Sequence, residues 1–301
     1  MERNTAKRTL EKLLSVCICL CMLGAMLPAQ VFAEEADTAQ TETVQDTAPK
    51  DTVYLSSADD LIQLAKNCRL DSWSQNRTVV LEADIDLFGV DFNGIPSFGG
   101  TWEGQNHAIT GLSLSQDGSV QGLFRYVQQG ALVRDMTVKG RIKPGGTRAS
   151  VGGIAGSNAG TIENCAFDGV VSGTSQIGGI AGVNTVKGSI NGCAVSGTVY
   201  GSHFVGGVVG QNDGVAANCT NAASVNTTVS QNEVKLNDLT LDDVLKTEKA
   251  NDVTDAGGIA GNNAGVLRAC INRGTIGYSH IGYNVGGIAG SQTGYVEGCV
   301  N

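Results

Sequence analysis

The chain has 301 residues, of which 42 are glycine and only 4 are proline, while aromatic residues make up 5%. A core must therefore be built from Val, Ile, Leu, Ala and Cys around small residues, which favours closely stacked β-structure over a helical bundle. The formal net charge of −9 argues against nucleic acid or an anionic membrane surface as a partner.

Residues 1–33 have the layout of a secretory signal peptide. MERNTAKR gives a basic start, LLSVCICLCMLGAML gives an apolar run, and VFA gives a small-residue cleavage site that ends at Ala33. This run is too short for a membrane span, and no later stretch is long and apolar enough for one. Residues 34–52 follow as an acidic leader that we expect to be disordered. We therefore predict a protein that is secreted or held at the cell surface.

Residues 53–118 are predicted to contain a capping helix and the first coils of the fold. SSADDLIQLAKNC, residues 56–68, offers Ser56 or Ser57 as the helix N-cap. Its apolar residues recur at helical spacing: Leu61, Leu64, Ala65 and Cys68. Such a helix would plug the first coil and prevent edge-to-edge strand addition.

A glycine-rich unit recurs five times within residues 119–301. GGIAGSNAG begins at Gly152, and its variants follow at spacings of 26, 28, 51 and 29 residues. A period of this size is typical of a solenoid, because propeller blades need about 40 or more residues. The long unit is interpreted as an ordinary one with a surface insertion at about 230–254, whose pattern suits a short helix.

Each unit divides into three short β-pieces separated by turns. Such a unit makes one coil of a stacked structure, with coils about 4.8 Å apart. The predicted fold class is all-β, a right-handed parallel β-helix (solenoid) with a short N-terminal capping helix. Positive φ is expected at the glycines between the first two pieces: Gly160, Gly214, Gly265 and Gly294.

Residues 119–142 align as a degenerate opening unit with larger side chains. With one extra residue allowed on each side of Gly130, the alignment places Phe124 over Ala155, Gly130 over Gly160 and Met136 over Cys165.

Two positions keep their chemistry in all five units. One is aliphatic: Ile154, Ile180, Val208, Ile259 and Ile288. The other is cysteine: Cys165, Cys193, Cys219, Cys270 and Cys299. We interpret the cysteines as an inward ladder of free thiols, since cysteine is among the most buried residue types. One or two disulfides between neighbouring coils are the alternative, whereas ligands spaced along a line cannot form a tetrahedral zinc site.

The tetrapeptide within the glycine-rich unit carries a family resemblance. GIAG stands at 153–156, 179–182, 258–261 and 287–290, and GVVG stands at 207–210. With DDLIQLAKN, VVLEADIDLFG and FGGTWEGQNHAITGLSLS before them, residues 53–301 resemble GLUG-motif repeat proteins. That motif recurs in exported bacterial surface proteins and before the catalytic domains of IgA-cleaving metallopeptidases. The resemblance implies an adhesin-like β-helical surface module and brings no catalytic residues with it.

The sequence gives little support for a phosphate site, a calcium site or a catalytic site. No GK[ST] and no helix follow the glycines, which argues against a phosphate site. The acidic residues Asp84, Asp86 and Asp91 could bind Ca²⁺, although turn and strand-edge roles explain them better. The histidines lie in separate units, HExxH is absent, and no acidic pair recurs on adjacent coils. We predict no catalytic residue, no cofactor and no metal.

Two aromatic segments precede glycine pairs, and we expect both to emerge on the same edge of the solenoid, two coils apart. They contain the candidate binding residues: Tyr200, His203, Phe204, Tyr278, His280 and Tyr283. Exposed aromatic rings beside polar groups can stack on sugars or anchor a protein partner, while the preferred interpretation is that these rings cover strand ends. The functional hypothesis is a non-catalytic surface module that binds a host or bacterial glycan or surface protein. The alternative is an accessory N-terminal region of a larger metallopeptidase or polysaccharide-degrading enzyme, with its catalytic domain outside this chain.

Overall fold

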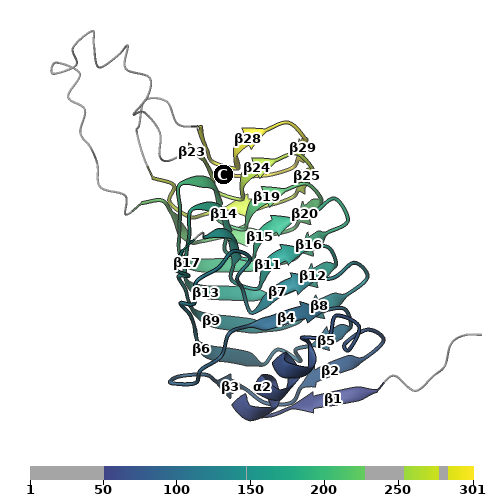
Figure 1. Ribbon diagram of the computed structural model, residues 1–301. Helices are drawn as coiled ribbons and strands as arrows, with labels where there is room; N and C mark the ends of the chain where they lie inside the picture. The colour runs from purple at the N-terminus through teal and green to yellow at the C-terminus, as the bar shows by residue number, and fades with distance from the viewer. Residues whose placement is uncertain (1–50, 147, 228–253, 278–283) are drawn as a thin grey trace, which may run out of the picture. The chain divides into compact units, whose positions relative to one another are not determined.

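The computed structural model describes residues 51–146, 148–227, 254–277 and 284–301. These residues form a stack of short strands whose pairings are parallel throughout (Figure 1). The predicted all-β parallel solenoid is confirmed, and its right-handed sense stays a prediction. The signal peptide, most of the leader and the insertion at about 230–254 lie outside the described residues, and the first strand begins at Thr52, inside the predicted leader.

The strands belong to four sheets that run along the stack. The nine-stranded sheet contains β1 (Thr52–Leu55), β2 (Thr78–Leu81), β5 (Thr101–Glu103), β8 (Leu132–Arg134), β12 (Thr161–Glu163), β16 (Ser189–Asn191), β20 (Val215–Ala217), β25 (Val266–Arg268) and β29 (Tyr295–Glu297). The eight-stranded sheet contains β3 (Ile85–Asp86), β6 (Ala108–Leu114), β9 (Thr137–Ile142), β13 (Ala166–Ser172), β17 (Ala194–Tyr200), β21 (Thr220–Asn221), β22 (Ser224–Val225) and β26 (Ile271–Asn272).

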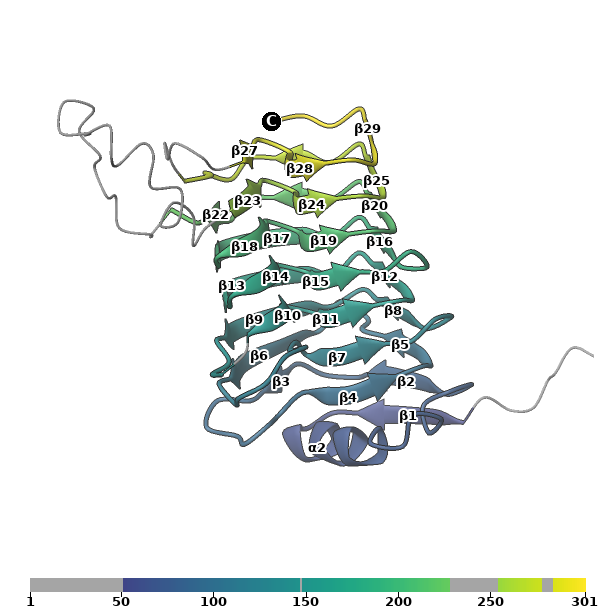
Figure 2. The ribbon, with the colours of Figure 1, turned by 45° about the horizontal axis from the view of Figure 1, so that its top comes forward.

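The other two sheets lie on a common face of the stack, which we call the front face (Figure 2). The seven-stranded sheet contains β4 (Ile95–Phe98), β7 (Phe124–Val127), β11 (Ala155–Asn158), β15 (Ala181–Asn184), β19 (Val209–Asn212), β24 (Ala260–Asn263) and β28 (Ala289–Gln292). The five-stranded sheet contains β10 (Ala149–Gly152), β14 (Ser175–Gly178), β18 (His203–Gly206), β23 (Thr254–Gly257) and β27 (Val285–Gly286).

The coils of the glycine-rich repeat, which begin at β10, take strands from all four sheets, so the prediction of three strands per unit is wrong. In the coil formed by β10, β11, β12 and β13, the chain turns at Gly153 and Ile154, and again at Asn164 and Cys165. Both corners fall inside segments that the sequence presents as single β-pieces. Asn164 has a left-handed φ of 49°, which redirects the strand without interrupting the apolar pattern.

The glycines of the GGxxG motif are required for space. A Cβ on Gly153 would collide with the ring of Phe167, and a Cβ on Gly156 would lie 2.8 Å from the backbone of Val120. The corner glycines predicted to have positive φ do not have it: Gly160, Gly214, Gly265 and Gly294. At Gly160, a Cβ would instead lie 2.6 Å from the carbonyl oxygens of Gln128 and Ala131. These glycines therefore allow stacked backbones to approach closely.

The interior is a set of aligned ladders. The predicted aliphatic ladder is confirmed, with Ile154 and Ile180 fully buried and Ile288 partly buried at the last coil. A ladder of amides was not predicted: the buried Asn158, Asn184, Asn212 and Asn263, and the exposed Gln292 in the last coil. Each asparagine Nδ2 donates to the side-chain oxygen of the next coil, at 2.8, 2.8, 2.7 and 2.9 Å in that order. The four asparagines are therefore core residues rather than exposed turn residues.

The opening unit aligns largely as predicted. Phe124 pairs with Ala155, and the pairing of Ala166 with Thr137 places Met136 over Cys165. Thr161 pairs with Leu132, so the residue over Gly160 is Ala131 and the prediction of Gly130 is wrong. Both extra residues lie on the N-terminal side of this position.

The predicted helix forms as α2 (Ala58–Asn67). Ser57 is its N-cap, and the Ser57 Oγ accepts a hydrogen bond from the Asp60 backbone N–H at 3.3 Å. Leu61 and Leu64 are buried in the core. Figure 2 shows α2 beside β4, and its function as an end plug stays a prediction. Within the described ranges, no helix has the length and apolar character needed to cross a membrane.

Candidate binding surface

The front face presents one side-chain row in register along the seven-stranded sheet: Ser97, Tyr126, Ser157, Val183, Gln211, Asn262 and Ser291. Serine, amide and aliphatic side chains fill this row except at Tyr126, which is 46% exposed. An exposed tyrosine in a polar row is an unusual feature of the face, because large aromatic side chains usually bury most of their surface.

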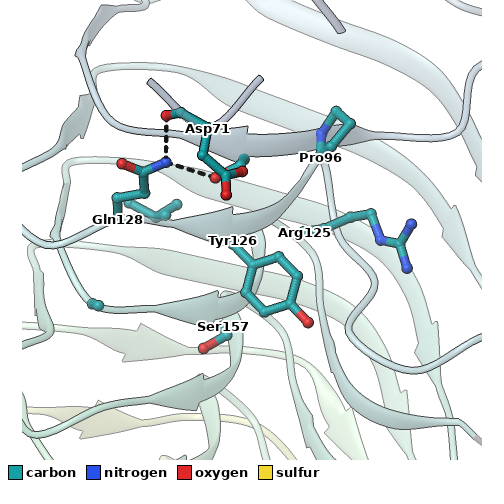
Figure 3. Close-up of a pocket in the computed structure, with 9 residues that line it drawn as sticks. Asp71, Pro96, Arg125, Tyr126, Gln128 and Ser157 are labelled. Atoms are coloured by element: carbon teal, nitrogen blue, oxygen red, sulfur yellow. Dashed lines mark hydrogen bonds between the residues drawn. The ribbon is translucent and has the colours of Figure 1, made fainter. Parts of the chain in front are cut away.

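A groove of about 710 Å³ surrounds this tyrosine. It is lined by Asp71, Pro96, Ser97, Arg125, Tyr126, Val127, Gln128, Ser157 and Ala159. Figure 3 shows the ring of Tyr126 at the centre, with Asp71 and Gln128 on one side and Pro96 and Arg125 on the other. The groove thus offers an aromatic surface surrounded by a carboxylate, a guanidinium, an amide and hydroxyl groups.

Hydrogen bonds hold one wall of the groove in place. The Gln128 Nε2 donates to the Asp71 carbonyl and to the Ser97 Oγ, both at 2.7 Å. The Gln128 Oε1 accepts from the Gln75 Nε2 at 3.0 Å. Gln128 therefore connects the backbone at Asp71 to β4, and the Asp71 side chain is exposed at the groove.

The groove exists because Arg125 stands where each later unit has glycine. The pairing of Phe124 with Ala155 aligns Arg125 with Gly156. At Gly156, the backbone of Val120 leaves no room for a side chain. The five-stranded sheet begins only at β10, so its strands do not crowd position 125 on β7. The long side chain of Arg125 therefore fits there. The Arg125 Nε donates to the Val120 carbonyl at 3.1 Å, which fixes the guanidinium beside the groove.

The predicted aromatic residues are only partly brought together. Tyr200 ends β17 on the eight-stranded sheet, whereas His203 and Phe204 open β18 on the front face. All three are of intermediate exposure. Their companions Tyr278, His280 and Tyr283 lie outside the described residues. The predicted common edge for the two segments therefore stays a prediction.

Phe204 has a backbone conformation that bulky residues rarely adopt. Its φ is 51°, in the left-handed region. The residues at the same register in the other coils are Ser150, Gln176 and Asp255, with φ of 57°, 59° and 59°. A phenylalanine thus occupies a strand position where polar side chains stand in the neighbouring coils.

A chain of polar side chains crosses the front face from one sheet to the other. The Ser150 Oγ donates to the Gln176 Oε1 at 2.7 Å, and the Gln176 Nε2 donates to the Gln211 Oε1 at 2.8 Å. The Gln211 Nε2 donates to both carboxylate oxygens of Asp213 at 3.0 Å. These contacts orient amide groups at the surface.

Two of the three acidic residues considered for Ca²⁺, Asp84 and Asp86, are engaged in local structure, and Asp91 is exposed. The Asp84 carboxylate accepts from the Ala108 N–H at 2.8 Å and contacts His107 Nδ1 at 3.1 Å, and these bonds lower the pKa of Asp84. The Asp86 carboxylate accepts from the Phe88 N–H at 3.0 Å. Among the described residues, no group of three or more His, Cys, Asp or Glu side chains could hold a metal ion.

The cysteine ladder faces inward as predicted. Cys165, Cys193, Cys219 and Cys270 are buried, Cys299 is half-buried, and all of them are free thiols. Burial raises the pKa of Cys165 to about 12. The pKa of Cys219 is raised first by its hydrogen bond with Cys193. Because the thiolate is the reactive form, these buried thiols are chemically inert packing groups.

The chain is similar to a curated protein over a short segment and to a solved structure over most of its length. No protein-family model matches the chain. Halomucin from Haloquadratum walsbyi is 32% identical over 93 residues, which are 31% of this chain and 1% of Halomucin. The solved structure of a candidate immunoglobulin A1 protease from Bacteroides ovatus aligns over 82% of this chain and 83% of that one, with 17% identity and a TM-score of 0.48. Neither similarity assigns a family, an activity or a ligand to this chain.

Sequence reasoning missed Tyr126 and Arg125. It attributed the larger side chains of the opening unit to the end of the solenoid. The available signal was the replacement of the invariant repeat glycine by Arg125, followed directly by an aromatic residue. A side chain at a position that otherwise excludes one indicates that the local backbone has changed.

Proposed function

We propose that this chain is an exported, non-catalytic β-solenoid module of the GLUG-motif type that binds a glycan on its front face. The observation that carries the proposal is the groove around the half-exposed ring of Tyr126. Sugar rings present apolar C–H faces and a rim of hydroxyl groups. An aromatic ring bordered by Asp71, Arg125 and Gln128 complements both, as ligand sites combine apolar surface with a few placed polar groups.

The exported location rests on the signal-peptide pattern of residues 1–33 and on the GLUG resemblance. The non-catalytic character rests on the chemistry of the groove. Asp71 is its one carboxylate and is exposed, whereas glycoside hydrolysis needs two carboxyl groups across one glycosidic bond.

A glycan and mucin array tests the proposal directly. The purified chain is compared with Tyr126→Ser and with Tyr295→Ser, a control on the nine-stranded sheet where Tyr295 is 55% exposed. Serine stands at positions 97 and 157 of the same row, so Tyr126→Ser should fold normally. We expect Tyr126→Ser to weaken binding about tenfold or more, which corresponds to about 1.4 kcal/mol, and Tyr295→Ser to leave it unchanged.

The array also separates glycan from protein recognition. Each mucin is presented before and after enzymatic removal of its sugars. Binding that survives deglycosylation would contradict the proposal and indicate a protein partner. Equal binding by the wild type and Tyr126→Ser would exclude the groove as the site.

A further inference from the structure

We infer that the binding site extends from the Tyr126 groove across the front face to Phe204, and that it takes a straight, neutral glycan chain. This inference rests on the proposed function and names its ligand class. We call the surface from Tyr126 through Ser157, Gln176 and Gln211 to Phe204 the front strip.

The two aromatic residues lie on one face and three coils apart. Tyr126 aligns with Ser157, Val183 and Gln211 in the following three coils. Phe204 belongs to the same coil as Gln211, since β18 leads directly into β19. At about 4.8 Å per coil, the offset along the stack is about 14 Å. That span suits several linked sugar rings rather than a single monosaccharide.

The strip is continuous because its two sheets touch. The Gln176 Nε2 of β14 donates to the Gln211 Oε1 of β19 at 2.8 Å, which joins the five-stranded to the seven-stranded sheet. In Figure 2, β14 lies beside β15 and β18 beside β19 across this face. A ligand running along the stack therefore meets side chains from both sheets without crossing a gap in the backbone.

The groups between the two rings suit hydroxyl-rich chains. Ser150, Gln176 and Gln211 hold one another through hydrogen bonds of 2.7 and 2.8 Å. Amides fixed in this way lose little conformational freedom when they bind a partner, which favours affinity. Amide and hydroxyl groups both donate and accept, as sugar hydroxyls do. The central part of the strip offers these neutral groups beside the Asp213 carboxylate, which favours an uncharged chain over an anionic one.

Phe204 marks the far end of the strip. Its ring is of intermediate exposure, and its φ of 51° is costly for a bulky side chain. Gln176 occupies the same register with φ of 59°. The left-handed φ recurs at this register in the neighbouring coils, so position 204 differs from its equivalents by its partly exposed aromatic ring and not by its backbone. Phe204 thus provides a second stacking surface.

The shape of the ligand follows from the parallel register. The coils stack in register along both sheets of the front face, so the row of side chains in each sheet runs straight along the stack, and the Gln176–Gln211 hydrogen bond joins the two rows. A β-1,4-linked hexose chain is extended and straight, whereas a helical or highly branched glycan would leave the surface. We therefore assign the strip to an extended β-1,4-linked chain.

Calorimetry with oligosaccharides of two lengths tests the inference. The probes are the disaccharide and the hexasaccharide of β-1,4-linked glucose and of β-1,4-linked N-acetylglucosamine, titrated into the purified chain. In at least one series, the hexasaccharide should bind about tenfold more tightly than the disaccharide. Phe204→Gln should reduce hexasaccharide affinity to the disaccharide level and leave the disaccharide unchanged. Tyr126→Ser should weaken both.

The variants keep the backbone requirements of their sites. Glutamine already stands at the Phe204 register in the previous coil, so Phe204→Gln should fold. Equal affinity for the two lengths, or an unchanged hexasaccharide affinity in Phe204→Gln, would overturn the front strip while the Tyr126 groove stands. If neither series of oligosaccharides binds, the assignment to a β-1,4-linked chain is wrong. The proposed function itself is overturned only if no glycan on the array binds the chain.

Discussion

Replacing Asn184 by alanine tests the buried amide ladder that runs through the solenoid. Asn184 is fully buried. Its Oδ1 accepts from the Asn158 Nδ2 at 2.8 Å, and its Nδ2 donates to the Asn212 Oδ1 at 2.8 Å and to the Val215 carbonyl at 3.1 Å. Alanine would leave polar atoms in both adjacent coils without these bonds. Each buried group left unsatisfied costs about 1–3 kcal/mol, so we expect a loss of about 2–4 kcal/mol.

Asn191→Ala is the matched control for this change. Asn191 lies in the same coil but is only partly buried, and Ala217 stands at its register in the next coil. Its loss should stay within about 0.5 kcal/mol. Urea unfolding followed by far-UV circular dichroism gives both free-energy differences. Equal losses for Asn184→Ala and Asn191→Ala would refute the structural role of the ladder.

Two further outcomes follow from the packing of the coils. A Cβ on Gly179 would collide with Val195 and with the Gly207 carbonyl. Gly179→Ala should therefore lower the free energy of unfolding in urea by about 2–3 kcal/mol. An unchanged urea midpoint would contradict the close approach of the two coils at Gly179. Burial raises the pKa of Cys165 from 9.0 to about 12. The thiol therefore loses its proton at lower pH in the unfolded chain than in the folded chain, and the free energy of unfolding should fall as pH rises from about 9 towards 12. Urea midpoints across this range should fall less steeply in Cys165→Ala, and an identical slope in both proteins would exclude a contribution from this thiol.

The fold was predictable from sequence because the solenoid repeats its chemistry. Glycine, isoleucine and cysteine return at nearly constant spacing, and stacked coils place equivalent residues over one another. Ile154 and Cys165 accordingly occupy the interior positions expected for them. The number of strands per coil was less accessible, since the corners at Gly153 and Asn164 leave the apolar pattern intact.

The buried amides and the groove were hidden for different physical reasons. Asn158 occupies an Asn-x-Gly sequence that is typical of an exposed turn, and only the neighbouring coils provide the partners that make its burial favourable. The groove depends on the absence of a five-stranded-sheet strand before β10, which is a property of the whole stack. The local signal, Arg125 in place of the repeat glycine, indicates a changed backbone but does not reveal the groove itself.

Saturation-transfer NMR with the glycan selected by the array is the most direct test of the central claim. If a sugar ring stacks on Tyr126, irradiation of the aromatic protons of the protein should transfer saturation mainly to the C–H protons of one sugar face. This transfer should disappear in Tyr126→Ser and persist in Tyr295→Ser. Undiminished transfer in Tyr126→Ser would contradict the account.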